Sequence, residues 1–390
     1  MAHVQDRWEK TVGGVRTKTA RHGTGKRWQA RYQDPDGRER TKDFARKVDA
    51  ERFLTTVTSD VLRGSYVDPD AGRITFGEFA DRWLHAQTFG DTTREATELR
   101  LRIHAIPTLG RRELRDVRPS VIQAWLRGLQ ERLAPTYVRA ILTSVSSVLA
   151  AAVDDGLIAR NPCRASSVKP PRIVARKIEP WSVGQVVAVI DALPGRYRAV
   201  GAVAAGCGLR QGEAFGIRVH DIDFLHHRLR VEQQVRIVGG HLQIDRPKGG
   251  KTRVVPLAEP VAVALAEHLR SWPPDGNGLI FTSREHKPLN RNYFNSHLWR
   301  PALLAAGVPP GRSNGMHALR HFYASVLIDA GESVKAVAEY LGHSDPGFTL
   351  RVYAHLFPAS EDRARKAVEA AFARSIVVQH GEDNRIKTRS

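Results

Sequence analysis

Apolar and polar side chains alternate over residues 28–32, a pattern typical of a β-strand. The turn-forming sequence Asp-Pro-Asp-Gly follows at 34–37, and basic and polar residues then alternate again. Over residues 48–62 the apolar positions change to helical spacing and share one face. Residues 1–66 are therefore expected to form a basic module that consists of a small sheet and one helix.

The second segment, residues 74–165, has the pattern of an all-α domain. Thr75 and Glu78 have the spacing of a capping box, which marks the start of a helix. After Pro135, apolar residues follow the i, i+3, i+4, i+7 pattern for four turns. A Pro-rich stretch at 161–172 is expected to be a linker.

The third segment, residues 175–375, mixes both patterns and is expected to be an α+β domain with an antiparallel sheet. Strands are predicted at 215–224, 229–237, 242–244 and 253–257. Helices are predicted at about 182–206, 259–270, 291–306, 317–330, 333–341 and 347–356. The polar residues 376–390 are expected to form a flexible tail.

Charge points to a polyanionic partner. The 390 residues include 60 Lys or Arg against 41 Asp or Glu, a net charge of +19, which favours nucleic acid over simple solubility. The two cysteines form no CxxC pair, so neither a disulfide framework nor a Cys-based zinc site is expected. Neither a signal peptide nor an apolar run of 18 residues is found, so we expect a cytoplasmic protein with no membrane partner.

Two short motifs resemble cofactor sites and are rejected. Residues 250–252 end like a Walker A loop, but Asp245 stands where the first glycine belongs and a strand follows. His317 and His321 have zincin spacing, but Ala318 replaces the glutamate of that motif. No metal and no cofactor are therefore expected.

Six residues in structured contexts form a candidate catalytic set. They are Arg210, Lys248, His317, Arg320, His343 and Tyr353. Taken singly, each has a structural interpretation; Arg210, for example, could pair with Glu213. Taken together, they suit metal-free transfer at a phosphodiester. Two guanidiniums stabilise the charge on phosphorus, a phenol attacks with help from histidine, and a lysine protonates the leaving oxygen.

These residues, in this order, resemble the motifs of the tyrosine recombinase (phage integrase) family. The resemblance rests on residues 208–213, Lys248, His317-x-x-Arg320, residues 341–343 and Tyr353. It implies that Tyr353 forms a 3′-phosphotyrosyl bond with DNA while Arg210 and Arg320 hold the phosphate. It also implies that His317 transfers protons, Lys248 protonates the leaving oxygen and His343 supports the phosphate. Lys251 is the competing lysine, and Glu213 would orient Arg210.

The resemblance extends to the other segments and to partners. Residues 1–66 are similar to the three-stranded arm-binding domain of phage-type integrases, and residues 74–165 to the helical core-binding domain. It implies duplex DNA attachment sites, a homotetramer on DNA, a nucleoid location, a mobile element to integrate or excise, and possible excision and host DNA-bending factors. A helix at 361–372 would link protomers. Candidate DNA contacts in the first module are Arg31, Arg38, Arg40 and Lys42.

Two alternatives remain open at this point. A type IB topoisomerase-like enzyme would relax DNA with the same chemistry, although the arm-like module argues against it. A non-catalytic DNA-binding relative would keep the scaffold, although the complete Arg-Lys-His-Arg-Tyr set argues against that.

Overall fold

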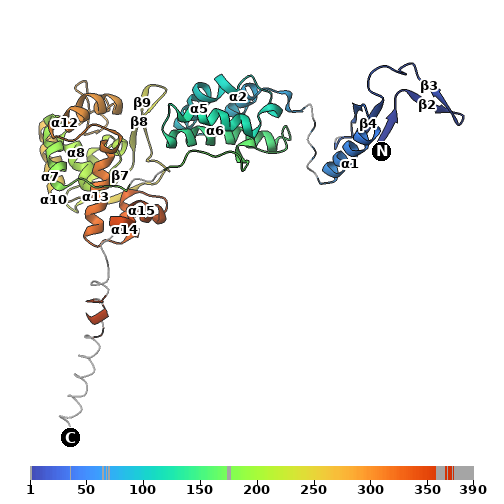
Figure 1. Cartoon of the computed structure of the whole chain (residues 1–390). Helices are drawn as coiled ribbons and strands as arrows, with labels where there is room; N and C mark the ends of the chain where they lie inside the picture. Colours follow the sequence, from blue (N-terminus) through green and yellow to red (C-terminus); the bar gives the residue numbers. More distant parts are fainter. Residues whose placement is uncertain are drawn as a thin grey trace, which may run out of the picture. The chain divides into compact units, whose positions relative to one another are not determined.

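The computed structural model describes residues 2–35, 37–63, 66, 68, 71–173 and 177–356 (Figure 1). Beyond these it describes residues 365–366, 368–370 and 372, which are helical. The rest of the predicted helix at 361–372 and the predicted tail at 376–390 lie outside the described residues. The chain divides into two compact units, residues 1–174 and residues 175–390, which are taken separately below.

The first unit begins with an antiparallel three-stranded sheet packed against helix α1. The sheet has the order β1-β4-β5, and its elements are β1 (His3–Asp6), β4 (Trp28–Gln33), β5 (Glu39–Phe44) and α1 (Lys47–Leu62). Ala30 and Tyr32 from β4 and Leu54 from α1 are buried in a small core, as the alternation predicted. An additional hairpin, β2 (Glu9–Val12) and β3 (Val15–Lys18), was not predicted from the sequence.

Helices make up the rest of the first unit. They are α2 (Phe76–Ala86), α3 (Asp91–Arg100), α4 (Ile106–Leu109), α5 (Pro119–Gln130) and α6 (Pro135–Asp154), with a π-helical turn at Leu101–Ala105 and 3₁₀ turns at Ala71–Arg73, Leu114–Asp116 and Pro162–Arg164. The predicted capping box opens α2, since the Glu78 amide donates to Thr75 Oγ1 and the Thr75 amide donates to Glu78 Oε2. The all-α prediction for this segment is confirmed at the level of secondary structure.

Helix α6 is the core helix of this bundle. Its predicted apolar face is buried, including Ile141, Val145, Val148 and Leu149. Among the described residues, α6 is the one helix that is long and apolar enough to cross a membrane, which corrects the expectation that no such segment exists. Length and apolar composition are shared by core helices of globular domains, and the buried face gives α6 that role here.

The second unit contains two small antiparallel sheets. The order β10-β7-β6 joins β6 (Ile222–Asp223), β7 (Arg228–Val231) and β10 (Arg253–Pro256), while β8 (Gln234–Val238) and β9 (His241–Asp245) form a separate hairpin. The strand predicted at 215–224 was wrong for most of its length. Phe215 ends a short helix and Ile217 is buried outside any named strand, so these apolar residues face the core without belonging to a sheet strand.

Helices carry most of the core of the second unit, and the β8-β9 hairpin lies at the edge of that unit (Figure 1). They are α7 (Val183–Ala192), α8 (Gly195–Cys207), α9 (Gln211–Phe215), α10 (Glu259–Ser271), α11 (Arg291–Tyr293), α12 (Arg300–Ala305), α13 (His317–Asp329), α14 (Val334–Leu341) and α15 (Pro346–Tyr353). A π-helical turn covers Phe294–Trp299, and 3₁₀ turns cover Val219–Asp221, Arg312–Asn314 and Ala354–Leu356. Helix α8 packs against both α10 and α13. The prediction of an antiparallel α+β unit is confirmed in its secondary structure.

Two glycines in left-handed conformation end the helices that matter most for the candidate site. Gly208 ends α8 with φ +63°, and Gly342 ends α14 with φ +62°. A Cβ on Gly208 would lie 2.3 Å from Tyr323 Cδ1, so a larger residue fits neither the backbone nor the space. The chain can therefore turn sharply from α8 into α9, where Arg210 lies.

We expect Gly208→Ala to destabilise the protein more than Gly240→Ala. Gly240 also has a positive φ, +78°, but nothing lies within 4 Å of its added Cβ. The left-handed backbone alone costs about 1–2 kcal/mol for an L-residue. In Gly208→Ala, but not in Gly240→Ala, overpacking against Tyr323 lowers the free energy of unfolding by a further roughly 1–3 kcal/mol. Urea unfolding of the full chain measures the difference, and equal losses in the two variants would contradict the packing argument.

Candidate active site

Three arginines converge on the carboxyl end of α14. Arg253 Nε donates to Tyr340 O at 2.7 Å, Arg320 Nη2 donates to Leu341 O, and Arg210 Nη2 donates to Gly342 O at 2.9 Å. The last carbonyls of a helix have no partner within the helix and carry its negative dipole end. These carbonyls are therefore suited to hold guanidiniums. Arg320 Nη1 also donates to Gly208 O at 2.7 Å, which ties α13 to the turn after α8.

The Glu213 carboxylate lies between two of these arginines. Arg210 Nη1 donates to Glu213 Oε1 at 2.7 Å, and Arg253 Nη2 donates to Glu213 Oε2 at 2.7 Å. The Glu213 side chain has no exposed surface. Burial alone would raise its pKa, but the hydrogen bond and charge of Arg253, together with the charge of Arg210, lower the pKa to about 2. Glu213 therefore stays ionised and offsets part of the positive charge.

The two proposed phosphate-binding arginines differ in their access to solvent. The Arg210 side chain is 25% exposed, whereas Arg320 is only 1% exposed. Burial and the charge of Arg210 lower the pKa of Arg320. An anion that approaches this surface could contact the exposed part of Arg210 directly. The buried charge of Arg320 would also attract it electrostatically.

Two histidines lie close to Arg210 and Arg320. The charges of Arg320 and Arg210 act on both His317 and His343, so these four residues lie close together. His317 is exposed at the start of α13. His343 Nδ1 lies 2.7 Å from Thr349 Oγ1, which orients its ring. Partial burial and the neighbouring arginines lower the pKa of His343 to about 4, so it is neutral at pH 7.

The candidate nucleophile, Tyr353, is buried at the end of α15. It is 1% exposed, and its hydroxyl lies 2.7 Å from His321 Nδ1. Burial raises the pKa of Tyr353 to about 12, although the charge of Arg320 opposes that shift. The phenol is therefore protonated at neutral pH and needs a proton acceptor before it can attack.

Lys248 lies apart from the other candidates. It is exposed in the connection between β9 and β10, where Gly249 and Gly250 adopt positive φ. The turn-like tip that the sequence predicts between two strands is present, since the Gly250 amide donates to Pro247 O at 2.8 Å. The two flanking strands belong to different sheets, because β9 pairs with β8 and β10 pairs with β7. In the described part of the chain, no hydrogen bond or ion pair joins Lys248 to the other five candidates.

The basic residues predicted to contact DNA in the first module have partners within that module. Arg31 pairs with Glu39 at 2.7 Å, Arg40 pairs with Asp34 at 3.0 Å, and Lys42 Nζ lies 4.5 Å from the centroid of the Phe53 ring. Arg38 is exposed, and its amide donates to Asp34 Oδ1. These contacts give the first three a structural role and leave DNA contact by all four as a prediction.

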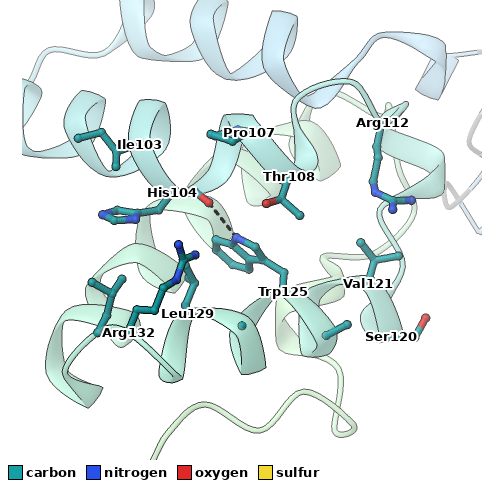
Figure 2. A pocket seen from close by; sticks show the side chains of 13 residues that line it. Ile103, His104, Pro107, Thr108, Arg112, Ser120, Val121, Trp125, Leu129 and Arg132 are labelled. Atoms are coloured by element: carbon teal, nitrogen blue, oxygen red, sulfur yellow. Dashed lines mark hydrogen bonds between the residues drawn. The ribbon is translucent and has the colours of Figure 1, made fainter.

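A hollow in the helical part of the first unit contains none of the candidates. It has a volume of about 710 Å³, and its lining includes His104, Pro107, Arg112, Trp125, Leu129 and Arg132. Figure 2 shows Trp125 at its centre, with the indole nitrogen donating to His104 O at 2.9 Å. Trp125 thereby satisfies its one polar group within the bundle.

Three side chains that matter at this site were missed as candidates in the sequence. Arg253 forms a second ion pair with Glu213, Thr349 orients His343, and His321 contacts the Tyr353 hydroxyl. His321 was considered only as half of a zinc motif. Its position directly after Arg320 is the signal that could have placed it beside the site.

We expect Glu213→Gln to reduce the loss of unfolding free energy that occurs as the pH falls. The folded pKa of about 2 lies below the ordinary 4.5, so this stabilisation is complete above about pH 5 and is lost as pH falls toward 2. It amounts to roughly 3 kcal/mol at neutral pH. Unfolding free energies at several pH values measure it, with Glu267→Gln at an exposed position of α10 as control. Parallel pH profiles for wild type and Glu213→Gln would contradict the assignment.

Comparison with known proteins matches most of the chain to one family. Residues 178–360 match the Phage integrase family, residues 19–63 match its N-terminal domain, and residues 76–168 match its central domain. The prophage phiRv2 integrase of Mycobacterium tuberculosis is 31% identical over 84% of this chain and 88% of its own length. A XerC-like tyrosine recombinase of Caldanaerobacter subterraneus is 26% identical over 87% of this chain and 94% of its own length.

Solved structures share the fold. The Tn1549 transposon integrase in complex with circular intermediate DNA superposes with a TM-score of 0.66 at 22% identity, over 76% of this chain and 99% of that one. A lambda integrase tetramer bound to a Holliday junction has a TM-score of 0.57 at 17% identity, over 81% of this chain and 93% of that one. The chain belongs to the phage integrase family of tyrosine recombinases, site-specific DNA recombinases that act through a covalent tyrosine intermediate.

Proposed function

We propose that this protein integrates and excises a phage or other mobile element by cleaving and rejoining duplex DNA through Tyr353. The observation that carries the proposal is the convergence of Arg210, Arg320, His317 and His343 at one surface, with Tyr353 buried beside Arg320. Such a surface offers positive charge and proton-transfer groups to a single phosphodiester. Family membership supports the same chemistry.

The two arginines bind the scissile phosphate. Arg210 offers a partly exposed guanidinium that Glu213 holds in place, and Arg320 supplies a buried charge. Guanidiniums stay protonated and fork onto phosphate oxygens, so they stabilise the extra negative charge of the pentavalent transition state. His343, oriented by Thr349, supports a non-bridging oxygen, and His317 assists proton transfer at the exposed rim of the site.

Tyr353 attacks phosphorus, which forms a 3′-phosphotyrosyl bond and releases a 5′-oxygen. Lys248 protonates that oxygen, and a different 5′-hydroxyl then attacks the phosphotyrosine and rejoins the strands. Tyr353 is buried and Lys248 lies in an exposed loop. DNA binding therefore has to open a path for the phosphate to the Tyr353 hydroxyl and bring the loop between β9 and β10 to the leaving oxygen before cleavage begins.

The other modules position the DNA. Residues 1–66 bind accessory arm sites, with Arg31, Arg38, Arg40 and Lys42 as candidate contacts, and residues 74–165 together with 175–375 clamp the crossover site. Matches to the N-terminal and central integrase domains support this division. Four protomers assemble on two attachment sites, and the lambda integrase tetramer bound to a Holliday junction supports a tetrameric assembly. The further partners of this proposal are an excision factor and a host DNA-bending protein, and the protein acts at the nucleoid in the cytoplasm.

We expect Tyr353→Phe to abolish covalent trapping while leaving DNA binding within about twofold, because only the nucleophilic oxygen is removed. The substrate is a duplex built from the junctions of the integrated element and nicked beside the scissile phosphate. Adduct formation is measured on denaturing gels in buffer with EDTA, since the proposed chemistry uses no metal ion. A Tyr353→Phe adduct would sink the nucleophile assignment, and strict dependence on Mg²⁺ would sink the metal-free mechanism.

We expect Lys248→Ala to slow cleavage of ordinary DNA by roughly 10²–10⁴-fold, the usual contribution of a general acid. A substrate whose bridging 5′-oxygen is replaced by sulfur should restore the rate, because a thiolate leaves without protonation. Lys251→Ala, three residues along the same loop, is the matched control and should have much less effect. If Lys251→Ala shows the rescued defect instead, Lys251 is the acid.

A further inference from the structure

The Tyr353 hydroxyl and the His321 ring form a buried pair beside the candidate site. Tyr353 Oη lies 2.7 Å from His321 Nδ1, and the two rings meet edge to face with centroids 5.7 Å apart. His321 is half-buried on α13, one residue after Arg320. The family resemblance assigns proton transfer to His317. The rings of His317 and His321 lie next to each other, with centroids 4.6 Å apart.

The surroundings of His321 keep it neutral. Burial, the neighbouring His317 and the charge of Arg320 lower the pKa of His321 to about 4. The charged and titratable groups that face it are His317 and Arg320 from α13 and Tyr353 from α15. A neutral imidazole that takes a hydrogen bond from a phenol at Nδ1 carries its own proton on Nε2. The lone pair that accepts a proton therefore already points at the tyrosine hydroxyl.

We propose that His321 is the catalytic residue that receives the Tyr353 proton during strand cleavage. This role rests on the proposed function. It assigns the deprotonation of Tyr353 to His321 in place of His317. His317 lies at the exposed rim of the site, and among the described residues it makes no hydrogen bond to Tyr353.

The step balances without any co-reactant. Tyr353 Oη bonds to phosphorus as its proton passes to His321 Nδ1, and the bond from phosphorus to the 5′-oxygen breaks. Lys248 gives that oxygen a proton and becomes a neutral amine. In rejoining, the attacking 5′-hydroxyl returns a proton to Lys248, and the imidazolium returns its proton to the departing tyrosine oxygen. Each residue therefore ends in its starting state.

DNA binding makes His321 a better acceptor. In the protein alone, the positive charge of Arg320 disfavours the imidazolium. A bound phosphodiester brings a negative charge to the arginines, and this charge offsets the repulsion between Arg320 and a protonated His321. The phosphate that Tyr353 attacks thus raises the basicity of the group that deprotonates Tyr353.

The test compares His321→Asn with wild type in the nicked-substrate assay. Asn Oδ1 can stand near the position of Nδ1 and keep the hydrogen bond, but an amide does not take the proton. We expect a cleavage rate reduced by roughly 10²–10⁴-fold at pH 7, with DNA binding and thermal unfolding unchanged. Between pH 7 and 9, the rate of the variant should rise about tenfold per pH unit as the phenol ionises unaided, whereas wild type should stay nearly flat.

Two further variants complete the test. His297→Asn is the matched control, since the His297 ring also contacts a tyrosine, Tyr293, but lies outside the proposed machinery, and it should cleave like wild type. His321→Ala should be at least as slow as His321→Asn. If either His321 variant cleaves at the wild-type rate or faster, the histidine only confines the tyrosine and the proposal is overturned. A wild-type chain that forms no adduct would instead overturn the proposed function, and this role with it.

Discussion

The ionised Glu213 carboxylate, buried between Arg210 and Arg253, is the interaction on which the candidate site depends. Three guanidiniums meet at the end of α14, and without compensation their mutual repulsion would oppose folding. The Glu213 charge offsets part of it, and the free carbonyls of residues 340–342 supply the remaining partners. Positive charge can therefore be concentrated at one surface before any phosphate arrives.

The arginines and carbonyls of this arrangement come from elements that are distant in the chain. The turn after α8 supplies Arg210 and the Gly208 carbonyl, α13 supplies Arg320, and α14 supplies its carboxyl end. The proposed phosphate-binding groups are thus held by backbone atoms, whose positions are set by helix packing. The proposed nucleophile and general acid are held differently, since Tyr353 is covered and Lys248 lies in an exposed loop.

Local patterns predicted the secondary structure wherever one periodicity dominated. Helix α6 and the buried residues of β4 follow directly from their spacing, and the capping box at Thr75 marked the start of α2 correctly. The strand predicted over residues 215–224 failed for a physical reason. The apolar residues around Phe215 were predicted to be a strand because they are buried, and burial alone does not specify backbone conformation.

The sequence by itself determined the family, the identities of the candidate catalytic residues and their order, because those depend on residue type and spacing. Only the tertiary structure decided which of them are neighbours and what state each is in. It showed Glu213 shared by two arginines, Tyr353 buried, and His321 in contact with its hydroxyl. Proton affinity and access depend on groups brought together from distant helices, and no spacing along the chain encodes those distances.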